Sequence, residues 1–439
     1  MKPNILFILV DSMRADKFFP KQDLQSYKKI IDESVYFEQN ISSSDYTVTG
    51  IGSIFTASYP VNAGLKGQVF QKLYSEKDNY VEFLKKQGYN AYGTIAESVA
   101  ELGFSQLFEN NDQTYPNSLR LFDGLGDKIT NFLKSENLVE PWFYFIHLED
   151  LHLPVSLPSK FDHVKYSERY EIAVTEIHSW ISKFLQLIEL ENCLVVITSD
   201  HGDYIPSIND SKDTDGTISK TKSIMKKNMP SDVFDTLSKA KRSLTKKIQE
   251  TQAKSLYDKR AIQTRTGKNR FLFDEIVRTP LLFSGFGVSS KKNIQQQVRN
   301  IDIFPTICDI IGLGQPETKI DGRSLKPLLD NKSLPDLPAY LESTVFATIQ
   351  KDVVAHLGIR SPKWKYFRKV SNPKENVHLY DLENDPLEEN NLSNGNAILI
   401  KEMEEEISKI RNNSKQPSME LDSDETKKVR DELRKLGYV

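Results

Sequence analysis

The amino-acid sequence predicts an α/β protein with a large, doubly wound, mostly parallel sheet flanked by helices, followed by a small C-terminal α+β subdomain. Three observations support this fold class: short apolar runs that end in polar residues, helical patterns between those runs, and alternating segments late in the chain. A chain of 439 residues is long for one compact domain. We therefore expect a large domain over residues 1–340 and a subdomain over residues 341–439.

The apolar runs cover residues 5–10, 142–146 and 193–197. They are rich in β-branched or aromatic residues and do not alternate with polar ones, which is typical of strands buried on both faces of a parallel sheet. Residues 80–87 and 170–189 lie between such runs and show helical patterns. In sheets of this kind, ligands bind beyond the carboxyl ends of the strands. The polar residues that follow each run are therefore the candidates for a site.

A lysine-rich, polar segment without a strand pattern covers residues 206–262. From Ser231 onward its apolar residues recur at roughly helical spacing, which predicts an amphipathic helix or a helical hairpin. We expect an exposed insertion, with a lid or a contact between the subunits of a homo-oligomer as alternatives. Its lysines could attract an anionic substrate, although such a face is more often simply solvated.

The segments after residue 340 predict the subdomain. Residues 353–359 and 364–370 alternate polar and apolar side chains, which favours a short antiparallel sheet. Helices are expected at residues 398–411 and 427–436, with a loose stretch between them.

Composition excludes several classes of protein. With 38% hydrophobic residues the chain can bury a core, and a net charge of −3 argues against nucleic acid or an anionic membrane as the main partner. Cys193 and Cys308 each lie in an apolar run, so we expect buried thiols and no disulfide framework. The first apolar run is too short to span a membrane and lacks a signal-peptide cleavage site. We therefore expect no membrane span and a cytoplasmic location.

Two carboxylates and an imidazole follow the first and third runs. Asp11 comes after residues 5–10, and Asp200 with His201 comes after residues 193–197. An Asp-His pair alone is more often a helix cap or a satisfied polar turn, but Asp11 at a like position favours a divalent metal with oxygen and nitrogen ligands.

Hydroxyl and imidazole groups near the same strand ends extend this set. Residues 44–60 carry several hydroxyls before a helical pattern. Such a hydroxyl can simply cap the helix, yet beside a cation it can become a nucleophile, with helix amides facing the developing charge. Residues 147–154 are expected to form a turn, in which His152 is the better candidate to bind an ester oxygen or protonate a leaving group. His147 is either a core residue or a second contact.

The chain resembles the sulfatase-like hydrolases of the alkaline phosphatase superfamily. The segments that carry the resemblance are residues 4–16, 147–154, 198–202, 267–282, 302–306, 322–325, 379–386 and 433–439. The resemblance implies that Asp11, Asp200 and His201 hold a metal. It also implies that His152 and Lys268, with His147 as a weaker candidate, bind the ester oxygens.

The sequence departs from that family at its nucleophile. Formylglycine-dependent sulfatases carry Cys or Ser, then any residue, Pro, Ser and Arg. Counting back from Thr56 and Pro60 places Thr47 at the first of these positions, Thr49 at the Pro, Gly50 at the Ser and Ile51 at the Arg. Because Thr cannot be oxidised to formylglycine, the hydrated-aldehyde mechanism is unavailable, and Thr47 itself is the expected nucleophile and metal ligand.

The metal site also departs from the common pattern. Ser12 stands where a second Asp ligand is usual, and His201 stands where many calcium sulfatases carry Asn. Imidazole favours one manganese or zinc ion over calcium or magnesium. This reduced set of ligands, together with Thr47, resembles the site of the phosphoglycerol transferases that build lipoteichoic acid. That resemblance implies one manganese ion and a Thr nucleophile. Those enzymes are anchored in membranes and act outside the cell.

We therefore expect a metal-dependent hydrolase or transferase that acts on a phosphate ester of a small molecule, glycan or lipid. The alternatives are a sulfatase that uses Thr47 without formylglycine and a non-catalytic binding protein that kept the fold. A two-metal, phosphomutase-like enzyme would need more His and Asp ligands, and the chain has 7 histidines.

Overall fold

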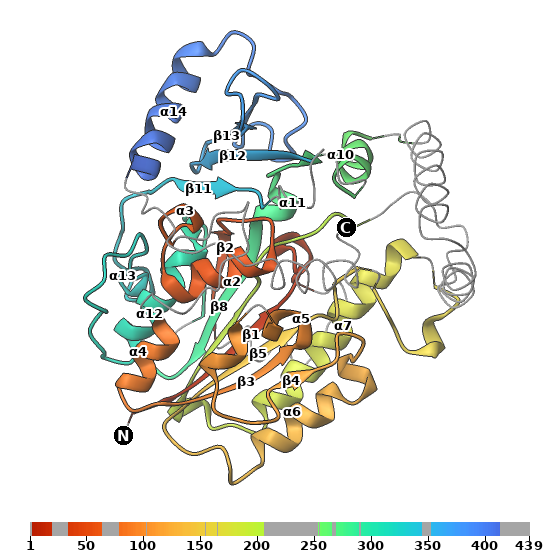
Figure 1. The fold of residues 1–439 in the computed structure, drawn as a ribbon, viewed down its shortest axis with the longest axis vertical. Helices are drawn as coiled ribbons and strands as arrows, with labels where there is room; N and C mark the ends of the chain where they lie inside the picture. The colour runs from red at the N-terminus through yellow and green to blue at the C-terminus, as the bar shows by residue number, and fades with distance from the viewer. Residues whose placement is uncertain are drawn as a thin grey trace, which may run out of the picture.

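The computed structural model describes residues 2–19, 34–63, 79–101, 103–153, 155–164, 166–205, 253, 255–265, 269–288, 291–344 and 353–412. In these ranges the chain forms a large mixed sheet between helices and a smaller sheet with a long helix, α14, beside it (Figure 1). The expected α/β class with a C-terminal α+β part is confirmed.

The large sheet has nine strands in the described part of the chain. In spatial order they are β10 (Val298–Arg299), β2 (Ser34–Ile41), β8 (Arg278–Gly285), β6 (Cys193–Thr198), β1 (Asn4–Val10), β5 (Trp142–Leu148), β3 (Asn90–Ala96) and β4 (Thr114–Tyr115), with β9 (Lys292–Ile294) beside β2. Only β8 among them runs antiparallel to its neighbours, β2 and β6. The three strands expected from apolar runs, β1, β5 and β6, are adjacent at the centre.

Two cores lie on the two faces of this sheet. Alternate residues of β1 point to opposite faces, as the two-residue period of a strand requires. Ile5, Phe7 and Leu9 join one core, which is covered by α2 (Thr47–Thr56), α4 (Tyr80–Lys86), α12 (Ile303–Ile310) and α13 (Lys326–Leu329). Leu6, Ile8 and Val10 join the other, which is covered by α6 (Leu125–Leu133) and α7 (Tyr166–Leu185). Because both faces are buried, the central strands carry apolar residues on both faces.

The smaller sheet is antiparallel, in the order β11 (Ala339–Glu342), β12 (Val354–Arg360), β13 (Trp364–Lys369) and β14 (His378–Asp381). β7 (Asn269–Arg270) pairs with β12 from far upstream in the sequence. Met403 and Ile407 of α14 (Ala397–Asn412) pack against this sheet. The remaining helices are α3 (Pro60–Ala63), α5 (Glu97–Glu101), α10 (Leu256–Arg265) and α11 (Asp274–Val277). The division into domains at residue 340 stays a prediction.

Some expectations differ from the structure or lie outside it. The turn expected over residues 147–154 starts later than predicted, because β5 continues to pair with β1 through His147 and Leu148. His147 is fully buried, which agrees with the alternative that it is a core residue. Residues 206–252 of the lysine-rich segment, and the helix expected at 427–436, lie outside the described residues. Across the part of the chain that the structure describes, no helix combines the length and apolar character that a membrane span needs.

His178 of α7 gives the fold a testable dependence on pH. Its side chain is fully buried beside Phe18, and burial lowers the pKa of its imidazole from 6.5 to about 3. The pKa of His178 is lower in the folded state than in the unfolded state. Its contribution to the free energy of unfolding is therefore fully present above pH 6.5 and is lost as the pH falls. Between pH 7 and pH 5 the loss should reach about 2 kcal/mol.

The His178→Leu variant should therefore lose less stability than the parent protein over this range. Urea unfolding of both proteins at pH 7 and pH 5 gives the loss in the free energy of unfolding for each. Subtracting one loss from the other removes the contribution of the other titrating groups, which both proteins share. Equal losses in the two proteins would show that His178 is not buried as an uncharged ring.

Candidate active site

Asp11 and Asp200 lie side by side because β1 and β6 are parallel neighbours in register. Leu9 of β1 is opposite Thr198 of β6, and each carboxylate follows two residues later. Both side chains are buried, with Asp11 1% and Asp200 0% exposed. Two carboxylates withdrawn from water in this way require positive charge or hydrogen bonds nearby.

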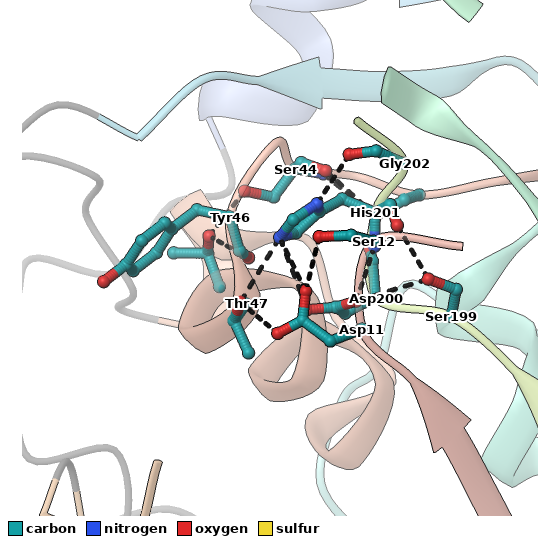
Figure 2. Close-up of polar contacts among 12 residues, drawn as sticks. Asp11, Ser12, Ser44, Tyr46, Thr47, Ser199, Asp200, His201 and Gly202 are labelled. Atoms are coloured by element: carbon teal, nitrogen blue, oxygen red, sulfur yellow. Dashed lines mark hydrogen bonds and ion pairs between the residues drawn. The ribbon is translucent and has the colours of Figure 1, made fainter. Parts of the chain in front are cut away.

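His201 supplies one of these partners. Its Nε2 lies 3.8 Å from Asp11 Oδ1 and 3.5 Å from Asp200 Oδ2 (Figure 2). Its Nδ1 lies 2.8 Å from the carbonyl oxygen of Gly202, which can only accept, so Nδ1 carries a proton and donates it. In the neutral ring the lone pair of Nε2 therefore faces the carboxylates, as in a metal-binding histidine.

Thr47 brings a hydroxyl to the same point. Its Oγ1 donates a hydrogen bond to Asp11 Oδ2 at 3.1 Å and lies 3.3 Å from His201 Nε2. Figure 2 shows these side chains converging, whereas the ring of Tyr46 points away. Thr47 is the first residue of α2, so the positive end of that helix faces the site. The structure thus brings together the four residues that the sequence proposed.

The donor atoms fit one small divalent cation. Asp11, Asp200 and His201 form the one group with metal-ligand spacing among the described residues, with ligand atoms within 4.8 Å of one another. A tetrahedral cation with bonds of roughly 2.0–2.2 Å places its ligands about 3.4 Å apart. The separations of 3.1 to 3.8 Å around Thr47 Oγ1 and His201 Nε2 agree with that value. Asp200 Oδ2 is buried without a hydrogen-bond partner in the described residues, which leaves it available as a ligand.

The pKa shifts reflect the same crowding of charge. Burial raises the pKa of Asp11, but the nearby imidazoles of His147, His201 and His152 outweigh it and hold that pKa well below its usual range. For Asp200, burial and the charge of Asp11 raise the pKa. Burial lowers the pKa of His201, yet the two carboxylates raise it overall to about 9. A positive charge is therefore strongly favoured between these carboxylates.

Two serines fix the loops that carry the carboxylates. Ser12 Oγ donates to Asp11 Oδ1 at 2.7 Å, and its backbone has a φ of 63°, a left-handed conformation that is uncommon for Ser. Ser199 Oγ donates to the carbonyl oxygen of His201 at 2.7 Å and accepts from the N–H of Met13 at 3.1 Å. These contacts tie the loop after β1 to the loop after β6. The sequence analysis missed both roles, and of these contacts only the one between Met13 and Ser199 joins distant segments.

Gly50 allows α2 to approach the loop that carries Asp200 and His201. A Cβ at this position would lie 2.8 Å from the carbonyl oxygen of Asp200 and 3.0 Å from its Cβ. Any larger residue would push α2, and with it Thr47, away from the carboxylates. Gly202 is restricted in the same way, because a Cβ there would lie 2.2 Å from the carbonyl oxygen of Glu275. A glycine inside a helical pattern was the available sequence signal for Gly50.

The remaining candidates differ in position. His147 is fully buried on β5, and its Nε2 lies 3.5 Å from Asp11 Oδ2, which is long for a hydrogen bond, so the attraction is mainly between charges. His152 lies in the turn after β5 and is half-buried. Its backbone N–H donates a hydrogen bond to the carbonyl oxygen of Glu149. Lys268 lies outside the described residues. The roles of these three residues in binding substrate stay predictions.

Comparison with known proteins identifies the family. The model of the Sulfatase family matches residues 3–313, and that of the N-sulphoglucosamine sulphohydrolase C-terminal region matches residues 265–413. A curated relative is the Delta 4,5-hexuronate-2-O-sulfatase of Bacteroides thetaiotaomicron, 28% identical over 129 residues, which are 29% of this chain and 26% of the relative. The matched regions span about a third or less of the curated relatives.

Solved structures share the fold over nearly the whole chain. A 2-O GAG sulfatase superposes with a TM-score of 0.65 at 16% identity, covering 98% of this chain and 96% of that one. The phosphonate monoester hydrolase of Agrobacterium radiobacter gives a TM-score of 0.64 at 13% identity, covering 94% and 96%. At these identities the likeness establishes the fold alone, while the family model covers well over half of the sequence. This chain belongs to the sulfatase family, within the sulfatase-like branch of the alkaline phosphatase superfamily.

Proposed function

We propose that this chain is a metal-dependent ester hydrolase or transferase in which the hydroxyl of Thr47 attacks a phosphate ester. The observation that carries the proposal is the position of Thr47 Oγ1, 3.1 Å from Asp11 Oδ2 and 3.3 Å from His201 Nε2 at the start of α2. A hydroxyl so placed has acceptors for its proton and a helix N-terminus for the developing negative charge.

Asp11, Asp200 and His201, with the oxygen of Thr47, would hold one divalent cation, manganese or zinc. Their fit rests on the spacing of the donor atoms and on Asp200 Oδ2, which has no hydrogen-bond partner in the described residues. When bound, the cation would lower the pKa of the Thr47 hydroxyl and neutralise negative charge on the ester.

The residues of the chain account for the other parts of the reaction. As Thr47 Oγ1 forms its bond to phosphorus, its proton passes to Asp11 Oδ2, which already accepts its hydrogen bond at 3.1 Å. His152 donates a proton to the leaving oxygen, and Lys268 binds a non-bridging oxygen. In the second step, water or an acceptor alcohol gives its proton to His152 as it attacks phosphorus, and the Thr47 oxygen leaves and takes its proton back from Asp11.

Hydrolysis of a sulfate ester by the same hydroxyl is the second candidate. It is supported by curated relatives named for sugar sulfates, the hexuronate-2-O-sulfatase above and an N-acetylglucosamine-6-sulfatase. Phosphate is favoured on chemical grounds, because Thr47 cannot form the aldehyde hydrate that releases sulfate in formylglycine enzymes. Turnover of matched aryl phosphates, aryl phosphodiesters and aryl sulfates by the metal-loaded protein separates the two candidates.

Replacing Thr47 by Ala should lower turnover on the order of a thousandfold or more, because the nucleophile is lost. Thr47→Ser keeps a hydroxyl and should retain much of the activity. In the parent protein, acid quenching followed by mass spectrometry should find the modification from the substrate on the peptide that contains Thr47.

Thr56→Ala is a matched control at the far end of α2, where the hydroxyl donates to the carbonyl oxygen of Gly52. It should leave turnover nearly unchanged. Full metal-dependent activity in the Thr47→Ala protein would remove the proposal.

Asp200→Asn tests the metal site through stability. Asn keeps the acceptor for the N–H of His201, which lies 2.9 Å from Asp200 Oδ1, but removes the charge that opposes Asp11. Without metal the variant should therefore be at least as stable as the parent protein. The free energy of unfolding of the parent should increase by about 2.7 kcal/mol at a free metal concentration of about 100 times Kd. The Asp200→Asn variant should lose most of that increase.

Thermal unfolding in EDTA and in manganese or zinc measures both effects. Asp203→Asn serves as the control, since that carboxylate accepts from the N–H of Tyr204 and stands outside the ligand group. A metal-dependent gain that survives in Asp200→Asn would contradict the assignment of ligands. A parent protein with no gain at all would instead favour a non-catalytic binding protein.

A further inference from the structure

The loop that leads into Thr47 is held by the C-terminal sheet. The N–H of Glu342, at the end of β11, donates to the carbonyl oxygen of Ser43 at 3.0 Å, and Ser44 forms a parallel bridge with Glu342. Two residues later, the N–H of Thr344 donates to Asp45 Oδ1 at 2.7 Å. Residues separated by about 300 positions in the sequence thus run side by side just before α2.

Three buried hydroxyls connect the same two segments. Thr49 Oγ1 lies 2.5 Å from Ser44 Oγ and 2.8 Å from Thr344 Oγ1. Thr49 also donates to the carbonyl oxygen of Tyr46 at 3.1 Å. A hydroxyl has one proton and two lone pairs. With its proton on the carbonyl oxygen of Tyr46, Thr49 can accept from both Ser44 and Thr344, whose hydroxyl oxygens lie 3.3 Å from each other.

This cluster holds the first turn of α2, which has no side-chain cap. Tyr46 is the N-cap residue, with an extended backbone, and makes no capping hydrogen bond with its side chain. The position of the first turn therefore depends on Thr49, two residues after Thr47, and on the groups that hold Thr49. Errors of about 1 Å in the placement of a reacting group can cost about a hundredfold in rate.

We propose that Thr344 is a positioning residue for Thr47. Its hydroxyl anchors Thr49 and its N–H anchors Asp45, so the C-terminal sheet sets where the first turn of α2 presents Thr47 to Asp11 and His201. The catalytic consequence rests on the proposed function of Thr47, whereas the anchoring of α2 does not.

The Thr344→Val variant removes the hydroxyl while it keeps the volume and the N–H that binds Asp45; Thr344→Ser restores the hydroxyl. For whichever aryl ester the parent turns over, kcat should fall about tenfold or more in the Val variant, with a smaller change in KM, and recover to within about threefold in the Ser variant. Thr49→Val should have a similar effect, and the double variant should be little worse than either single one.

Hydrogen exchange of the peptide over residues 44–56 provides a readout that does not need turnover. Exchange should be faster in Thr344→Val than in the parent and in Thr344→Ser. Thr94→Val is the control: it breaks another buried hydroxyl pair, Thr94 with Tyr144 at 2.7 Å, between β3 and β5. It should lower the midpoint of urea unfolding by a similar amount and leave kcat and exchange at 44–56 unchanged.

Unchanged exchange in Thr344→Val would overturn the anchoring, and faster exchange with an unchanged kcat would overturn the positioning role. If the parent shows no turnover that depends on Thr47, the proposed function has failed, and the exchange result alone decides whether Thr344 holds α2.

Discussion

Two carboxylates buried next to each other determine the arrangement of this site. Leu9 and Thr198 lie opposite each other on adjacent parallel strands, and Asp11 and Asp200 each follow two residues later. The sheet itself therefore sets the separation of the two carboxylates. Burial of two like charges is costly unless positive charge lies between them. His201, the start of α2 and a cation are the groups that can provide it. The loops around the carboxylates, tied by Ser12 and Ser199, are consistent with a site built to hold charge in place.

The central sheet and the candidate metal-ligand carboxylates were predictable because both depend on local patterns. Apolar runs without alternation identified β1, β5 and β6, and the rule for ligands at strand ends placed Asp11, Asp200 and His201 in one region. Thr47 was found through a family resemblance and a helical pattern, and its distance from the carboxylates confirms that the four residues meet. Their chemical roles stay predictions.

The parts that sequence reasoning missed depend on contacts between distant segments. β8 runs antiparallel between β2 and β6, and nothing in its own residues indicates its direction. His147 was expected in a turn, yet pairing with β1 extends the strand past it. The close approach of Gly50 to Asp200, and the contacts of Thr344 with Asp45 and Thr49, join residues that are far apart in the chain. Such pairs have no signature in a single sequence.

The central claim is that Asp11, Thr47, Asp200 and His201 surround one cation. Crystals of the protein grown with manganese or zinc, measured at the absorption edge of that metal, test it most directly. One strong anomalous peak is expected within bonding distance, roughly 2.0–2.2 Å, of atoms from these four side chains. A peak at another place, or a fully loaded metal with Thr47 Oγ1 outside its coordination sphere, would show that these four residues do not form one metal site.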